Sequence, residues 1–147
     1  MKKAILLSIS IVLSAVFVSG QNKSLSVDDF KFDGPLGCKG ALIEKVEENH
    51  FKLIPGHAPN HPNWPNMIQF EITGNAKGNS LRLDVDFPVK DATYHFDDYF
   101  NSWSYDNENW TPVQWREYQH ADSRRSNVLI FPEFKEDKVF VGHQVPL

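Results

Sequence analysis

Apolar and polar residues alternate with a period of two in several stretches of this chain, which is the pattern of β-strands with one buried and one wet face. The clearest stretches are residues 68–72, with Ile, Phe and Ile at every second position, and residues 81–87, with Leu, Leu, Val and Phe. Turn-forming residues 74–79 join them. We expect residues 68–72 and 81–87 to form a pair of strands.

Shorter runs of the same kind occur on both sides of this pair. Residues 28–33 alternate until Gly34-Pro35, and residues 41–47 and 50–54 flank Glu48-Asn49 as a hairpin would. Residues 128–131 and 139–141 indicate two late strands. Since no stretch of ten residues has helical periodicity, the pattern predicts an all-β fold, a jelly-roll-like antiparallel β-sandwich in a single domain over residues 21–147.

Residues 103–110 give the most specific local signal, a hairpin with aromatic residues on both sides of an Asp-Asn-Glu-Asn turn. Asp106 follows Ser104 by two residues, so its carboxylate can accept hydrogen bonds from backbone N–H groups of the turn. Trp103 begins the first strand and Trp110 the second. We expect a structural hairpin of Trp103, Ser104, Asp106 and Trp110, with the Trp110 ring buried in the core for about 4–6 kcal/mol.

The first twenty residues have the form of an export signal. Lys2 and Lys3 precede an apolar run over residues 4–18, and small residues Ser19-Gly20 follow. Residues 1–20 are therefore predicted to be a signal peptide. The remaining chain contains no apolar stretch long enough to span a bilayer, so we expect it to be exported to the periplasm or the extracellular space.

Charge and cysteine content narrow the classes of partner and fold. Without Lys2 and Lys3 the chain has 13 basic and 19 acidic residues, a formal charge of −6 in place of −4. This acidity argues against nucleic acid as a partner. Cys38 is the sole cysteine, so no disulfide framework is expected, and we interpret it as a small buried residue.

Several residue clusters resemble reactive sites but lack the required geometry. His57 and His61 lie in a proline-rich segment, residues 56–65, which we interpret as a loop and which cannot place them on one helical face. Asp97-Asp98 and the 106–109 turn do not match a calcium-binding loop, although calcium binding stays open. His120, Asp122 and either Ser123 or Ser126 are near one another only in sequence. No catalytic, cofactor-binding or metal-ligating residue is assigned.

Aromatic residues are concentrated between positions 94 and 115. They comprise Tyr94, Phe96, Tyr99, Phe100, Trp103, Trp110 and Trp115. Exposed aromatic rings in a sandwich can stack against sugars, whereas buried ones build the core. We expect most of them to be buried, and we keep a carbohydrate-binding module, with a glycan as ligand, as an alternative function.

Five segments together carry a resemblance to a known family. They are Phe-Asp-Gly at 32–34, Ile-Glu-Lys-Val at 43–46, Ile-Gln-Phe-Glu-Ile-Thr-Gly at 68–74, Ser-Tyr-Asp-Asn-Glu-Asn-Trp at 104–110 and Val-Phe-Val-Gly-His-Gln-Val-Pro at 139–146. In this order they resemble the N-terminal β-sandwich that precedes the catalytic domain of cytosolic-type zinc metallocarboxypeptidases and their bacterial relatives. The resemblance covers about residues 30–147.

The catalytic residues of that family have no counterpart here. None of the six histidines is followed by Glu at the third position, so the His-x-x-Glu metal motif is missing from this sequence. The resemblance therefore implies a non-catalytic accessory domain that acts in peptidase packing or in substrate or protein recognition. The alternative is the N-terminal fragment of an active zinc carboxypeptidase, whose catalytic domain would begin where Leu147 ends this sequence.

The last nine residues, 139–147, are apolar and free of charge. Val141, His143, Val145 and Leu147 are therefore predicted to form a partner-binding edge, since a charge-free apolar surface favours association. The alternative is that these side chains complete the core of the sandwich.

Overall fold

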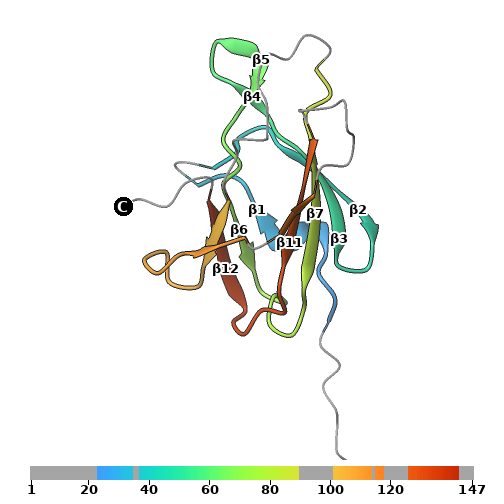
Figure 1. Ribbon diagram of the computed structural model, residues 1–147, viewed down its shortest axis with the longest axis vertical. Helices are drawn as coiled ribbons and strands as arrows, with labels where there is room; N and C mark the ends of the chain where they lie inside the picture. The colour runs from blue at the N-terminus through green and yellow to red at the C-terminus, as the bar shows by residue number, and fades with distance from the viewer. Residues whose placement is uncertain (1–22, 35–36, 90–100, 114, 118–125, 143–147) are drawn as a thin grey trace, which may run out of the picture.

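The computed structural model describes residues 23–34, 37–89, 101–113, 115–117 and 126–142, with only the backbone for 115–117. Two five-stranded sheets pack face to face (Figure 1). The expected all-β sandwich is confirmed. The predicted signal peptide lies outside the described residues, and among those residues no helix is long and apolar enough to cross a membrane.

The first sheet, called sheet A, contains the strands in the order β1, β6, β12, β8 and β9. Their bounds are Phe30–Lys31, Phe70–Thr73, Lys138–Gly142, Ser102–Ser104 and Thr111–Pro112. A single turn of 3-10 helix, η1 (Val27–Asp29), precedes β1. The two outer strands β1 and β9 have only two residues each, which leaves little unpaired edge for uncontrolled association.

The second sheet, called sheet B, contains the strands in the order β10, β11, β7, β3 and β2. Their bounds are Trp115–Glu117, Ser126–Phe131, Leu81–Asp86, His50–Ile54 and Leu42–Glu47. The β2–β3 hairpin forms where expected, with Asn49 at a φ of 55° in its turn. β3 and β7 run parallel, so sheet B is mixed and departs from the expected uniformly antiparallel arrangement.

The predicted pairing of residues 68–72 with 81–87 is wrong. β6 pairs with β1 and β12 in sheet A, whereas β7 pairs with β11 and β3 in sheet B. The turn between them crosses from one layer to the other, with Gly74, Asn75 and Gly78 at positive φ. Alternation identifies a buried face but not the neighbouring strand, so it is equally compatible with strands that face each other across the core.

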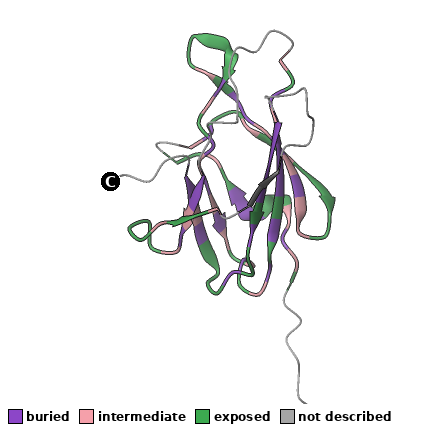
Figure 2. Ribbon diagram, viewed as in Figure 1, coloured by how far each residue is buried: buried purple, intermediate pink, exposed green. Residues whose placement is uncertain are grey.

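The core lies between the two inner faces, as the purple segments in Figure 2 show. Sheet A contributes Phe30, Phe70, Ile72, Val139 and Val141, and sheet B contributes Phe51, Leu53, Leu81, Leu83, Val85, Leu129 and Phe131. Phe134, in the turn between β11 and β12, closes one end of this core and is 1% exposed. The alternation therefore predicted the buried faces of β3, β6 and β7 correctly.

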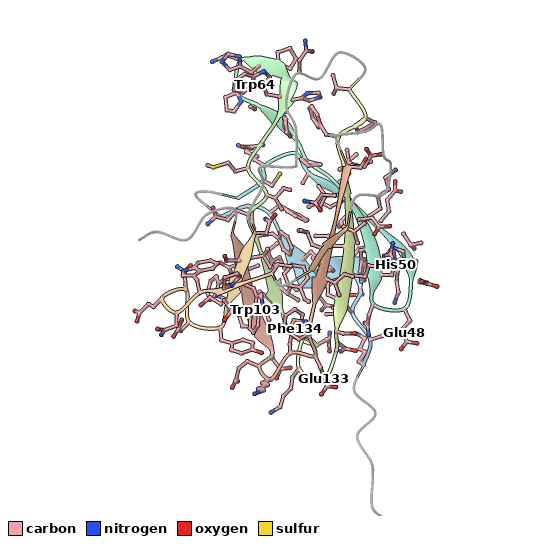
Figure 3. The ribbon with its side chains drawn as sticks, in the orientation of Figure 1. Glu48, His50, Trp64, Trp103, Glu133 and Phe134 are labelled. Atoms are coloured by element: carbon pink, nitrogen blue, oxygen red, sulfur yellow. The ribbon has the colours of Figure 1, made fainter. Side chains whose placement is uncertain are left out.

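Residues 57–65 form a small hairpin and not the irregular loop expected from their prolines. β4 (His57–Ala58) pairs with β5 (His61–Pro65), and Asn60 has a φ of 61° in the turn. The His57 ring nitrogen Nδ1 lies 2.6 Å from the Pro62 carbonyl oxygen, which ties the two strands together. The hairpin projects beyond the sheets and carries Trp64 on β5 (Figure 3).

Candidate functional site

The β8–β9 hairpin is held by hydrogen bonds that converge on Ser104 and Asp106. The Ser104 hydroxyl oxygen accepts hydrogen bonds from the backbone N–H groups of Asp106 and Asn107, at 3.2 and 2.9 Å. Asp106 Oδ1 accepts hydrogen bonds from the N–H groups of Glu108 and Asn109, at 2.9 and 2.7 Å. Asn107 has a φ of 62°. These bonds give the exposed turn a defined shape, as the Ser-x-Asp spacing predicts.

The same bonds stabilise the charged form of the Asp106 carboxyl group. Donation by the backbone and side chain of Asn109, followed by the Glu108 N–H and the Ser104 hydroxyl, lowers the pKa of Asp106 well below its usual value. Protonation would weaken these bonds, because a neutral carboxyl group is a poorer acceptor. The turn is therefore expected to loosen in acid.

Trp103 and Trp110 lie on opposite faces of sheet A. Trp103 pairs with Val141 and faces the core, where its ring centroid is 5.9 Å from that of Phe134 (Figure 3). Trp110 is half-buried and lies over Gly142 on the outer face. The expectation that Trp110 enters the core is therefore wrong. Trp103 already occupies the inward position of β8, and Trp110 precedes the first paired residue of β9.

A cleft of about 520 Å³ is open on the outer face of sheet A. Its floor is lined by Glu71 of β6, by Phe140 of the neighbouring strand β12, and by Gln69, the residue before β6. Trp110 and Asn107 line it from the β8–β9 turn, and Asp33 and Gly34 line it from the segment after β1. The cleft thus combines aromatic rings with amide and carboxylate groups.

The charged groups at the cleft are largely engaged with protein partners. Lys138 Nζ lies 2.9 Å from Glu71 Oε2 and 4.4 Å from the centre of the Phe140 ring. Lys31 Nζ donates a hydrogen bond of 2.7 Å to the backbone carbonyl of Asp28. The cleft therefore offers a ligand mainly aromatic and amide groups, because Lys31 and Lys138 are already bound to other groups of the protein.

The outer face of sheet B carries a network of polar side chains. His50 Nε2 lies 2.8 Å from Asp84 Oδ2, and Arg82 Nε donates to Asp84 Oδ1 at 3.0 Å. Ser126 donates its hydroxyl hydrogen to Asp86 Oδ1 at 2.9 Å. Within the described residues Ser126 and His50 have different partners, Asp86 and Asp84, so these two side chains do not form the Ser-His pair that a Ser-His-Asp site requires.

The predicted partner edge is only partly within the described residues. Val141 is fully buried between the sheets and belongs to the core, so its assignment to a partner-binding edge is wrong. It faces inward because β12 is flanked by β6 and β8 and its alternate residues point to the core. His143, Val145 and Leu147 lie outside the described residues.

Among the described residues, the remaining candidates do not assemble into a site. Cys38 is buried as expected, and burial raises the pKa of its thiol to about 11, which disfavours the reactive thiolate. Within the described ranges, no three His, Cys, Asp or Glu side chains are placed to hold a metal ion. His120, Asp122, Ser123, Asp97-Asp98 and the aromatic residues at 94–100 lie outside those ranges, as does the Trp115 side chain.

The floor of the cleft was not among the sites predicted from the sequence. A usable signal is present in the sequence, because Phe140 lies between Val139 and Val141 in a strand where alternation calls for a polar residue. A large aromatic residue on the outer face of a sheet requires a reason, such as a ligand or a covering segment. Gln69 and Glu71 give no comparable signal, since polar residues are ordinary at outward positions.

Comparison with known proteins gives few matches. No protein-family model matches the chain, and no curated protein matches its sequence. A crystal structure of a "putative carboxypeptidase" from Burkholderia mallei ATCC 23344 is similar to this structure, with a TM-score of 0.49 and 21% sequence identity. The similarity covers 69% of this chain and 24% of that one, so this chain spans about a quarter of that protein's length.

Proposed function

We propose that this chain is an exported, non-catalytic accessory domain that packs against a peptidase domain or helps it recognise a polypeptide substrate. One observation carries the proposal. Three of the five segments that resemble the zinc carboxypeptidase accessory domain contribute β6, the β8–β9 turn and β12 of sheet A, and a fourth, residues 32–34, directly follows β1 of the same sheet. Segments as far apart in sequence as residues 34 and 139 thus lie on one side of the sandwich.

The exposed turn between β8 and β9 is suited to contact a partner. It projects from sheet A, as the orange loop at the lower left of Figure 1, and Figure 2 shows it as exposed. The hydrogen bonds to Asp106 restrict the turn before binding, so little conformational entropy is lost on association. Glu108 lies at its tip with an exposed side chain.

The test is binding in trans. Residues 21–147 are titrated with the separately produced catalytic domain of a zinc carboxypeptidase of the resembled family, and the complex is followed by sedimentation velocity. We expect binding at or below about 100 µM, the weak end of specific association. Glu108→Lys should weaken it, and Glu136→Lys, an exposed reversal in the β11–β12 turn, should not.

Two outcomes would contradict the proposal. One is the absence of any complex with the catalytic domain at that concentration. The other is release of a C-terminal residue from a model peptide by residues 21–147 alone, in a reaction that a chelator stops and zinc restores. The second outcome would mean that the chain carries its own metal-dependent peptidase activity.

A further inference from the structure

We propose that the cleft on the outer face of sheet A binds a neutral saccharide, with Trp110 as the stacking surface and Gln69 and Glu71 as hydrogen-bonding partners. Its volume of about 520 Å³ is in the range of small-molecule sites, which is roughly 300–1,000 Å³. The inference does not depend on the proposed peptidase partner.

Trp110 is held in place for stacking. Atoms Cη2 and Cζ3 of its ring would be 3.1 Å from a Cβ atom at position 142, so the ring rests against the backbone where Gly142 has no side chain. Asn101 Nδ2 donates a hydrogen bond of 3.4 Å to the Gly142 carbonyl and fixes that backbone. A fixed aromatic ring offers the C–H face of a sugar a large apolar surface with little loss of side-chain entropy.

The floor supplies groups that match sugar hydroxyls. A hydroxyl both donates and accepts hydrogen bonds, and the amides of Gln69 and Asn107 do the same. The Glu71 carboxylate is an acceptor whose Oε2 is held by Lys138 at 2.9 Å. A sugar lying against Trp110 would therefore meet donors and acceptors along one side and an apolar ring along the other.

The charges favour a neutral ligand. Lys31, Asp33 and Glu71 line the cleft and Lys138 pairs with Glu71, so the four charges cancel. An anionic ligand would be repelled by the carboxylates of Asp33 and Glu71. The two lysines that could attract it, Lys31 and Lys138, already have oxygen partners in the protein. A purely apolar side chain of a protein partner would bury Gln69 and Glu71 without replacing their hydrogen bonds to water, which is unfavourable.

The experiment uses the full chain from residue 21 and three neutral probes, which are the hexamers of β-1,4-glucose, β-1,4-N-acetylglucosamine and α-1,6-mannose. Binding is followed by tryptophan fluorescence and by the shift of the Trp110 indole N–H resonance. At least one hexamer should bind with a dissociation constant between about 10 µM and 1 mM. Trp110→Ala should weaken that binding by about tenfold or more, as expected for a central aromatic residue.

Control variants distinguish the loss of a specific binding site from a general effect of removing a tryptophan. Trp64→Ala removes an exposed tryptophan on the β4–β5 hairpin and should leave binding unchanged. Trp110→Phe should restore part of the affinity lost in Trp110→Ala. If Trp110→Ala fails to fold, Gln69→Ala provides the test, and it should weaken binding several-fold with little change in melting temperature.

The proposal is overturned if none of the three hexamers binds at about 10 mM, a concentration at which even weak specific ligands saturate. It is also overturned if binding survives both Trp110→Ala and Gln69→Ala, or if hexagalacturonate, an anionic hexamer, binds more tightly than the neutral ones. Loss of peptidase-domain binding in Trp110→Ala, without binding of any hexamer, would assign the cleft to a protein partner and overturn it too.

Discussion

The two outer faces of the sandwich differ although both sheets cover the same core. On sheet B the outward residues of β3 and β7 bind one another, with His50, Arg82 and Asp84 in one cluster and Lys52 and Asp86 3.5 Å apart. On sheet A a cleft is open over Phe140, and the Trp110 ring rests on bare backbone.

This difference separates a face maintained for stability from a face available for binding. Asp84 is 8% exposed and its two carboxylate oxygens have partners, so the sheet B cluster satisfies its own polar groups. Half-buried aromatic rings beside amides contribute little to folding when they line an open cleft, yet they suit a ligand. Substitutions on the outer face of sheet B should therefore mainly lower stability, whereas substitutions on the outer face of sheet A should mainly weaken binding.

The largest expected effect is on the shared core. Leu83→Ala removes a fully buried side chain of sheet B and should lower the free energy of unfolding by about 2–5 kcal/mol. Phe140→Ala removes a larger side chain from the outer face of sheet A and should cost about 1 kcal/mol or less, because the ring stays partly in water. Urea unfolding of both variants measures this, and equal losses would place Phe140 in the core.

The next largest effect on stability is expected for the removal of a carboxylate from the outer face of sheet B, compared with the removal of one from sheet A. Asp84→Ala leaves His50 Nε2 and Arg82 Nε without this acceptor at a largely buried site and should cost about 1–3 kcal/mol. Glu71→Ala breaks only the exposed pair with Lys138 and should cost about 0–1 kcal/mol. Thermal unfolding of the two variants tests the contrast, which fails if Glu71→Ala is the more destabilised.

A smaller effect on stability is expected at the backbone under Trp110. In Gly142→Ala the new methyl group would meet the ring at 3.1 Å, so the indole must shift by a few tenths of an ångström. We expect a shifted tryptophan emission, several-fold weaker hexamer binding and a loss of about 1 kcal/mol or less. For the emission and the stability, Gly34→Ala is the matched control, since its Cβ would have no neighbour within 4 Å; binding is not compared, because Gly34 lines the cleft. An unchanged emission in Gly142→Ala would contradict the contact.

The smallest effect concerns pH and the β8–β9 turn. The pKa of Asp106 is lower in the folded chain than its unfolded value of about 3.9. Its contribution to stability is therefore present above about pH 4 and is lost as the pH falls through the lower folded value. Asp106→Asn should thus destabilise the chain slightly at pH 7 and reduce the drop in melting temperature between pH 7 and pH 2. An identical drop in both proteins would argue against the Asp106 bonds.

Local sequence signals predicted local structure well. The Glu48-Asn49 turn, the Ser104–Asp106 spacing and the inward residues of β6 and β7 each depend on neighbours within a few positions, and the structure places them as expected. The positions of Trp110 and Val141 were predicted wrongly, since each depends on a strand far away in sequence. Trp110 meets Gly142, 32 residues later, across the outer face of sheet A.

The sequence by itself determined the all-β class, the buried face of most strands and the hydrogen-bonded turn at Asp106, because alternation and turn chemistry act between near neighbours. Only the tertiary structure decided which strands share a sheet, since a turn such as 74–79 can either close a hairpin or cross between layers. The tertiary structure also forms the cleft. Gln69, Trp110 and Phe140 become one surface only when β6, β12 and the β8–β9 turn lie side by side.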